Sequence, residues 1–225
     1  MNLRPFYRLS GAILVAMLVV SAWGLAQVPA DAQVPVHWGP TGEADGFAEP
    51  LIAFLATPLI ALALVGLLVL VPRIEPRREN LERSGAAYRA VATALVAVVG
   101  IIHVAVVAAG AGAEVPVAAV IGLVIGLLFA VIGNVLGTVR SNFMFGIRTP
   151  WTLSSERSWD RTHRLVGRVF VVGGLALAVL ALAGQVLVLI GAMLAFVAVV
   201  LVASFLYSYC VWRDDPDRRA VGGGS

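Results

Sequence analysis

The sequence contains no lysine, a single cysteine and few charged residues. All 16 basic side chains are arginine, which excludes mechanisms that need a lysine amine, such as Schiff-base catalysis. Because Cys210 has no second cysteine to pair with, a disulfide within the chain is impossible. Charged residues make up 13% of the chain, whereas soluble domains carry roughly 25%. This deficit excludes an ordinary soluble globular domain.

Catalytic and nucleotide-binding motifs are also missing. The chain has no Gly-x-Ser-x-Gly elbow, no His-Glu-x-x-His and no phosphate-binding Gly-x-x-x-x-Gly-Lys. Glu43, Asp45 and Gly46 lack the ligand spacing and the final glutamate of a calcium loop. We therefore expect no enzyme activity, no cofactor and no metal. A membrane hydrolase built on His37 or His163 is an alternative without an obvious nucleophile.

Long apolar runs dominate what is present. The chain is 60% hydrophobic, with a mean hydropathy of +0.94. About 20 apolar residues in a helix cross the roughly 30 Å hydrocarbon core of a bilayer. None of the runs alternates polar and apolar residues, so membrane strands are not expected. We predict an all-α integral membrane protein, a bundle of six transmembrane helices: Phe6–Ala26, Leu51–Val71, Ala90–Ala109, Val115–Val139, Leu165–Ala183 and Val186–Val211.

The arginines predict the orientation of these spans. In a six-span arrangement every arginine falls on one side of the membrane, whereas the other side carries only acids: Asp31, Glu43, Asp45, Glu49 and Glu114. The positive-inside rule places the arginine side in the cytoplasm, so both termini are predicted to be cytoplasmic in a multi-pass protein of the cell (inner) membrane. The basic pI of about 9.6 then reflects topology, and we expect no nucleic-acid partner.

The loops divide the chain into two predicted membrane domains. The first covers residues 1–89 and includes an outer loop at 27–50, which is rich in proline and glycine. The second covers residues 90–221 and includes the long cytoplasmic loop at 140–164. Residues 222–225, Gly-Gly-Gly-Ser, look like an appended expression linker.

The cytoplasmic loop carries the densest set of polar and aromatic residues. Pro150 should hold Thr149 extended, and Ser154 is a suitable N-cap for a helix that continues into the fifth span. Along this helix the arginines at 157, 161, 164 and 168 share a sector of about 60°. The stripe is interpreted either as an anchor on anionic headgroups or as a docking face for a cytoplasmic partner.

We predict that this loop folds back as a rigid cap. Arg148 can bridge several carbonyls or a carboxylate through its fork of donors, with Glu156 and Asp160 as nearby acceptors. Tryptophan rings supply apolar surface, and Asn142 can bond the backbone just after the fourth span. The candidate residues of this cytoplasmic motif are Arg148, Thr149, Pro150, Trp151, Thr152, Glu156, Trp159, His163, Arg164 and Arg168.

Small and polar residues mark the third and fourth spans. The fourth span has a doubled small-xxx-small stripe, which predicts close packing of another helix, at Gly122, Gly126, Gly133 and Gly137. His103 and Asn134 are polar side chains at membrane depth and are therefore functional candidates. The alternative for both is an interhelical hydrogen bond to serine or threonine.

The outer loop has a recognisable local pattern. Residues 33–38 look extended, and Gly39-Pro40-Thr41-Gly42 is typical of a turn. The acidic side would attract a cationic peptide to the membrane surface. The candidate residues for contact with such a peptide are His37, Trp38, Gly42 and Asp45, although packing on the helix ends is the simpler role for the tryptophan.

These two loops resemble those of a known family. Residues 146–153, Gly-Ile-Arg-Thr-Pro-Trp-Thr-Leu, with Trp159 and the pair Arg164 and Arg168, resemble the SdpI family of bacterial membrane immunity proteins. The outer loop resembles the extracytoplasmic domain that precedes the SdpI module. The resemblance implies resistance to a secreted antimicrobial peptide. It also implies signalling, in which the toxin-occupied membrane protein sequesters a small cytoplasmic transcriptional repressor.

Two other functions remain open on the residues alone. The polar residues at membrane depth and the three-plus-three layout fit a small transporter or channel, and the chain could also be a passive membrane scaffold. A continuous polar path past Asn134 would favour transport, whereas a dry, glycine-packed interior would favour binding.

Overall fold

The computed structural model describes residues 1–218. The predicted linker at 222–225 lies outside the described residues, as does Arg219. Within residues 1–218, six helices are long and apolar enough to cross a membrane: α1 (Arg4–Gln27), α2 (Pro50–Ile74), α4 (Gly85–Gly110), α5 (Val117–Leu136), α7 (Glu156–Leu182) and α8 (Val186–Arg213). The predicted six-span helical membrane fold is confirmed, with boundaries that differ by a few residues.

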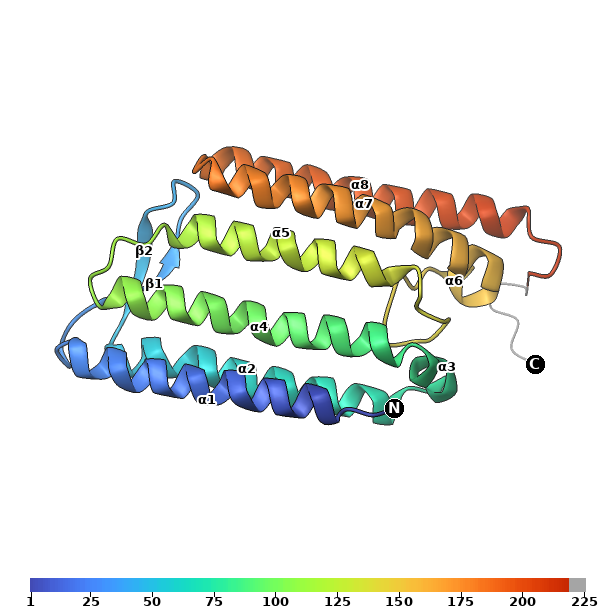
Figure 1. Ribbon diagram of the computed structural model, residues 1–225. Helices are drawn as coiled ribbons and strands as arrows, with labels where there is room; N and C mark the ends of the chain where they lie inside the picture. The colour runs from blue at the N-terminus through green and yellow to red at the C-terminus, as the bar shows by residue number, and fades with distance from the viewer. Residues whose placement is uncertain (219–225) are drawn as a thin grey trace.

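The six helices form two groups of three. Helices α1, α2 and α4 contact one another, and α5, α7 and α8 form the second group. Contact between α4 and α5 joins the groups into an elongated row of helices (Figure 1). The boundary predicted at residues 89 and 90 falls inside α4.

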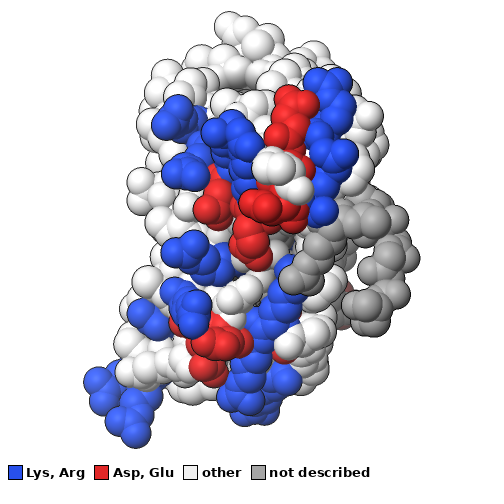
Figure 2. Space-filling view, turned by 90° about the vertical axis from the view of Figure 1, so that its right-hand side faces the viewer, with Lys and Arg blue, Asp and Glu red and all other residues white. Residues whose placement is uncertain are grey.

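The helices run side by side, and the loops at their two ends differ in character. One end carries the short helices α3 (Arg78–Arg83) and α6 (Pro150–Ser154), together with the N-terminus and the last described residues (Figure 1). Arginine side chains spread over this end, with acidic side chains between them (Figure 2). We call it the arginine-bearing end. Its assignment to the cytoplasm remains a prediction from the positive-inside rule.

The other end carries a β-hairpin in the loop after α1. Strands β1 (Val34–Trp38) and β2 (Ala44–Ala48) pair antiparallel, with Val34 opposite Ala48 and Trp38 opposite Ala44. We call residues 34–48 the outer hairpin. Gly42 in its turn has φ +87, a conformation that favours glycine. Val34 is buried among residues of α2 and α4, so the hairpin is fixed to the helix ends.

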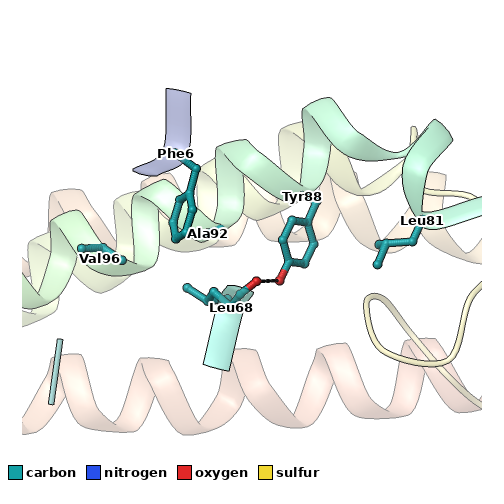
Figure 3. Close-up of a cluster of buried hydrophobic side chains, with 6 residues drawn as sticks. All are labelled: Phe6, Leu68, Leu81, Tyr88, Ala92 and Val96. Carbon is teal, nitrogen blue, oxygen red and sulfur yellow. Dashed lines mark hydrogen bonds between the residues drawn. The ribbon is translucent and has the colours of Figure 1, made fainter. Parts of the chain in front are cut away.

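The first helix group has a tightly packed interior near the arginine-bearing end. Phe6, Leu68 and Tyr88 bring α1, α2 and α4 together (Figure 3). The Tyr88 hydroxyl donates to the Leu68 carbonyl at 2.6 Å, so the only polar atom of this side chain is satisfied. By contrast, large apolar side chains elsewhere are exposed, such as Val172 at 70% on α7. Such exposure fits a surface that faces lipid.

Candidate functional site: a folded cap at the arginine-bearing end

The connection between α5 and α7 is folded, as predicted. We call residues 139–155 the cap. Asn142 is fully buried and organises its first turn: the side-chain carbonyl accepts from the backbone N–H of Met144 at 3.0 Å and of Phe145 at 2.6 Å. Its amide donates to the carbonyls of Arg140 and Phe145 at 2.8 and 2.9 Å. Asn142 thus bonds the local backbone through both ends of its amide.

A buried carboxylate ties the cap to the segment after α2. Glu75 is 4% exposed and accepts the backbone N–H of Phe143 at 3.1 Å, as well as that of Arg77 at 2.8 Å. Arg77 in turn donates to the Ser141 hydroxyl and to the Leu153 carbonyl. A charged group bonded in this way to backbone N–H donors makes strong hydrogen bonds. Neither Glu75 nor Arg77 was predicted to contact the cap.

An aromatic pair from α7 forms the floor of the cap. Trp159 is fully buried, donates to the Val139 carbonyl at 2.6 Å and stacks on His163 at 4.0 Å between ring centroids. His163 Nε2 accepts from the backbone N–H of Ile147 at 2.9 Å, so Nδ1 carries the proton and donates to the Trp159 carbonyl at 2.8 Å. In this arrangement the His163 ring is neutral, and its role is structural.

Glycine is required above this aromatic pair. Gly146 has φ +123, and a Cβ there would lie 2.5 Å from His163 Nε2 and 3.2 Å from the Trp159 ring. Both the backbone conformation and the space therefore exclude a side chain. This explains why the glycine precedes the arginine-threonine-proline-tryptophan segment.

The threonine-proline-tryptophan-threonine segment begins the short helix α6, which packs against α8. Thr149 is its N-cap, with φ −81 and ψ 159, and forms a capping box with Thr152. The extended conformation predicted for the residue before Pro150 is confirmed. Trp151 packs edge-on against Phe205 and Tyr209 of α8, with centroid distances of 4.5 and 5.2 Å.

Two details of the predicted cap are corrected. Arg148 does not bridge several groups or a carboxylate: among the described residues it donates to one acceptor, the Phe143 carbonyl, at 2.6 Å. The backbone there is already held by Asn142 and Glu75. The N-cap of α7 is Ser155, whose hydroxyl accepts from the Ser158 N–H at 2.9 Å, and not the predicted Ser154.

The cap also reaches the end of α8. The Ser155 hydroxyl donates to Asp215 at 2.5 Å, and this hydrogen bond lowers the pKa of the Asp215 carboxyl below its ordinary value. Beside this contact lies a polar cleft of 430 Å³. Its lining includes charged groups of both signs, among them Arg77, Arg157, Glu156 and Asp215.

The arginine stripe on α7 points away from the cap's interior. The four arginines at 157, 161, 164 and 168 are exposed, whereas Trp159, Thr162 and Val166 on the other side are fully buried. The helix is therefore amphipathic here, and the predicted arginine stripe lies on its exposed side. Glu156 is exposed in the first turn of α7, where a carboxylate suits the helix dipole.

The glycine stripe of α5 packs closely on α7, as predicted. A Cβ at Gly126 would lie 2.6 Å from the Gly174 carbonyl, and one at Gly133 would lie 2.4 Å from the Gly167 carbonyl. The partner glycines on α7 were not identified from the sequence. At the two ends of the stripe, Gly122 faces Leu189 and Ala181, and Gly137 faces the stem of Arg164.

The two polar residues at membrane depth have different surroundings. His103 is fully buried between α1, α2 and α4, where it bonds Thr57 through Nδ1 at 2.6 Å and the Met17 carbonyl through Nε2 at 3.0 Å. Ser21 lies 3.2 Å from the same Nε2. The interhelical hydrogen-bond interpretation is therefore confirmed for His103. Asn134 is exposed on the surface of α5 and does not lie in the interior of the bundle. The transport hypothesis assumed a polar path past Asn134, so this position is contrary to its premise.

The candidate outer-loop residues lie on the outer hairpin. His37 Nδ1 is 2.5 Å from Asp45, and both side chains are exposed. Trp38 is half-buried, and Gly42 lies against Val186 at the start of α8. The hairpin therefore reaches across the helix ends opposite the arginine-bearing end, from the first group to the second (Figure 1).

These features define a multi-pass helical membrane protein with a folded cap at one end and a β-hairpin at the other. The sequence model of the SdpI/YfhL protein family matches residues 138–208, the cap with α7 and most of α8. A domain of unknown function, DUF1648, matches residues 12–62, which include the outer hairpin. The Immunity protein SdpI of Bacillus subtilis (strain 168) is 26% identical over 178 residues, 79% of this chain and 83% of that protein.

The resemblance to the SdpI family is thereby confirmed, together with the N-terminal domain that accompanies it. No solved structure matches the chain.

Proposed function

We propose that this chain is a membrane immunity protein that protects a bacterium from a secreted antimicrobial peptide. The observation that carries the proposal is the similarity to the Immunity protein SdpI, because it covers 79% of this chain and 83% of that protein. The most specific sequence block, residues 146–153, also lies within the matched family segment. We expect no enzymatic activity.

The outer hairpin is the proposed contact surface for the peptide. Val36 and Phe47 are large apolar side chains exposed at 40% and 54%, and the exposed pair His37 and Asp45 lies on the same two strands. An amphipathic cationic peptide presents apolar and positively charged groups, so exposed apolar surface on an acidic loop is complementary to it. Positive-inside orientation would turn this hairpin outward.

The interior supports binding over transport. The contact between α5 and α7 is made by glycines whose added Cβ atoms would strike backbone. His103 is enclosed by Thr57, Ser21 and the Met17 carbonyl, which satisfy both ring nitrogens. Asn134 lies on the surface. Its position gives no support to a polar path through the second helix group, which the transport hypothesis requires.

We further propose that the cap is the surface offered to a small cytoplasmic repressor. The cap is fixed by bonds to three other parts of the chain, through Glu75, Trp159 and Asp215, so it can present a constant shape. The 430 Å³ cleft beside Ser155 supplies charged groups of both signs for such a partner.

The immunity proposal is tested by expressing the full chain in a bacterium sensitive to a secreted SdpI-type peptide toxin. We expect the chain to raise the toxin concentration that halves survival, and a Gly126→Leu variant with disrupted packing to lose protection. Equal survival with the chain and with an empty vector, at confirmed membrane expression, would refute the proposal. Toxin-independent efflux of an unrelated cationic dye would favour transport instead.

A further inference from the structure

A groove runs along the contact between α5 and α7 near the arginine-bearing end. It has a volume of 330 Å³, and its floor includes Gly133 and Gly167, where the two helices meet most closely. Three polar side chains line it: Asn134 from α5, and Arg164 and Arg168 from α7. Two helices thus present two guanidinium groups and an amide to one hollow.

These polar groups have little to bond within the protein. Among the described residues, neither Asn134 nor Arg168 makes a side-chain hydrogen bond or an ion pair, and Arg164 donates only to the Asp160 carbonyl one turn earlier, at 3.2 Å. Charged and amide groups near hydrocarbon are costly unless something satisfies them. The groove therefore offers unused donors for a partner outside the chain.

The groove lies at the depth of lipid phosphates. Helix α5 has 20 residues, about 30 Å at 1.5 Å per residue, which matches the hydrocarbon thickness of a bilayer. Asn134 is in its last turn, and the facing Arg168 lies beside it along the same groove. Both side chains are thus at the boundary between hydrocarbon and headgroups.

The surface that continues from these side chains into the bilayer is apolar. Val172 lines the groove and is 70% exposed. A second groove of 450 Å³, between α7 and α8, is lined by Arg168, Val172 and Phe196 and is almost wholly apolar. The two grooves share Arg168 and Val172, so the charged group of Arg168 lies beside an apolar groove as well as in the polar one.

We propose that this groove binds an anionic phospholipid, with the phosphate on Arg164, Arg168 and Asn134 and an acyl chain along Val172. Guanidinium groups bind phosphate oxygens in pairs, and the amide adds a donor of fixed direction. The stem of Arg164 rests on Gly137, where a Cβ would lie 3.1 Å from its Cγ, so the absence of a side chain at this glycine leaves room for the arginine stem. This proposal does not rest on the immunity function.

Lipid binding to the purified full chain tests the proposal by native mass spectrometry. The probes are phosphatidylglycerol and phosphatidylcholine with identical acyl chains. We expect tighter binding of phosphatidylglycerol, and about a tenfold loss of its affinity in Arg168→Gln, as for a lost charge-assisted hydrogen bond. The matched control is Arg161→Gln, an exposed arginine of the same helix outside the groove, which should change affinity less than about twofold.

Asn134→Leu provides a second variant, because this exposed position tolerates an apolar side chain without disturbing the helix contact. It should weaken phosphatidylglycerol binding while elution on gel filtration stays unchanged. Equal binding of the two lipids would overturn the proposal, as would equal losses in Arg161→Gln and Arg168→Gln. Displacement of the lipid by inorganic phosphate alone would also overturn it, because the groove would then recognise a free anion.

Discussion

Replacing Gly126 with alanine should separate α5 from α7. The added Cβ would lie 2.6 Å from both the Ala178 nitrogen and the Gly174 carbonyl oxygen. Both are backbone atoms of α7, so no side-chain rotation can relieve the contact and the helices must move apart. Overpacking of this kind costs about 1–3 kcal/mol. It would weaken the contact between α5 and α7, which is the most extensive helix contact of the second group.

Gly66→Ala is the matched control, since a Cβ at this exposed position of α2 meets nothing within 4 Å. Both variants replace a mid-helix glycine with alanine, so both gain about 1 kcal/mol in helix propensity. The difference between their unfolding free energies, measured by denaturant titration in mixed micelles, therefore isolates the steric cost. We expect Gly126→Ala to be the less stable by about 1–3 kcal/mol. Equal stabilities would refute the close-packing account.

Three further predictions concern the ends of the molecule. With the native cysteine removed, a cysteine at Thr41 should react with a membrane-impermeant reagent in whole cells, whereas one at Glu156 should not. The reverse pattern would show that the predicted topology is inverted. Asn142→Ala should lower the unfolding free energy by about 2–3 kcal/mol, because it leaves two part-buried backbone N–H groups unpaired. Arg148→Lys should cost less than about 1 kcal/mol, and equal effects would contradict the view that Asn142, and not Arg148, holds the cap. The folded-state pKa of Asp215 is lowered, so the ionised carboxylate should stabilise the fold above pH 3.8, and this stabilisation should fade as the pH falls below that value. In thermal melts from pH 7 to 3, Asp215→Asn should lack this loss of stability at low pH.

The helices could be predicted from the sequence because their apolar runs are uninterrupted and long. The outer hairpin was only half predicted. Residues 33–38 were expected to be extended, but the second strand, Ala-Asp-Gly-Phe-Ala at 44–48, has little intrinsic strand preference. The hairpin also depends on packing against the ends of α2 and α4, which is not a local effect.

The cap shows the same division between local and distant effects. The roles of Asn142 and Thr149 follow from bonds to residues three positions away or fewer, which sequence patterns report. Glu75 and Asp215 were missed because their cap partners lie 68 and 60 positions away, and in sequence both look like ordinary surface acids. Arg148 was given too large a role, because these distant carboxylates were not counted among the groups that hold the loop.

The proposed contact between the outer hairpin and a peptide toxin can be tested most directly by photo-crosslinking. A photoreactive phenylalanine analogue can replace Phe47 on the hairpin or Phe143 in the cap, positions that are 54% and 38% exposed. In cells that survive exposure to the peptide, we predict a covalent adduct between peptide and protein at position 47 and none at position 143. Protection with no adduct at position 47, or with an adduct only at position 143, would contradict the proposed immunity mechanism.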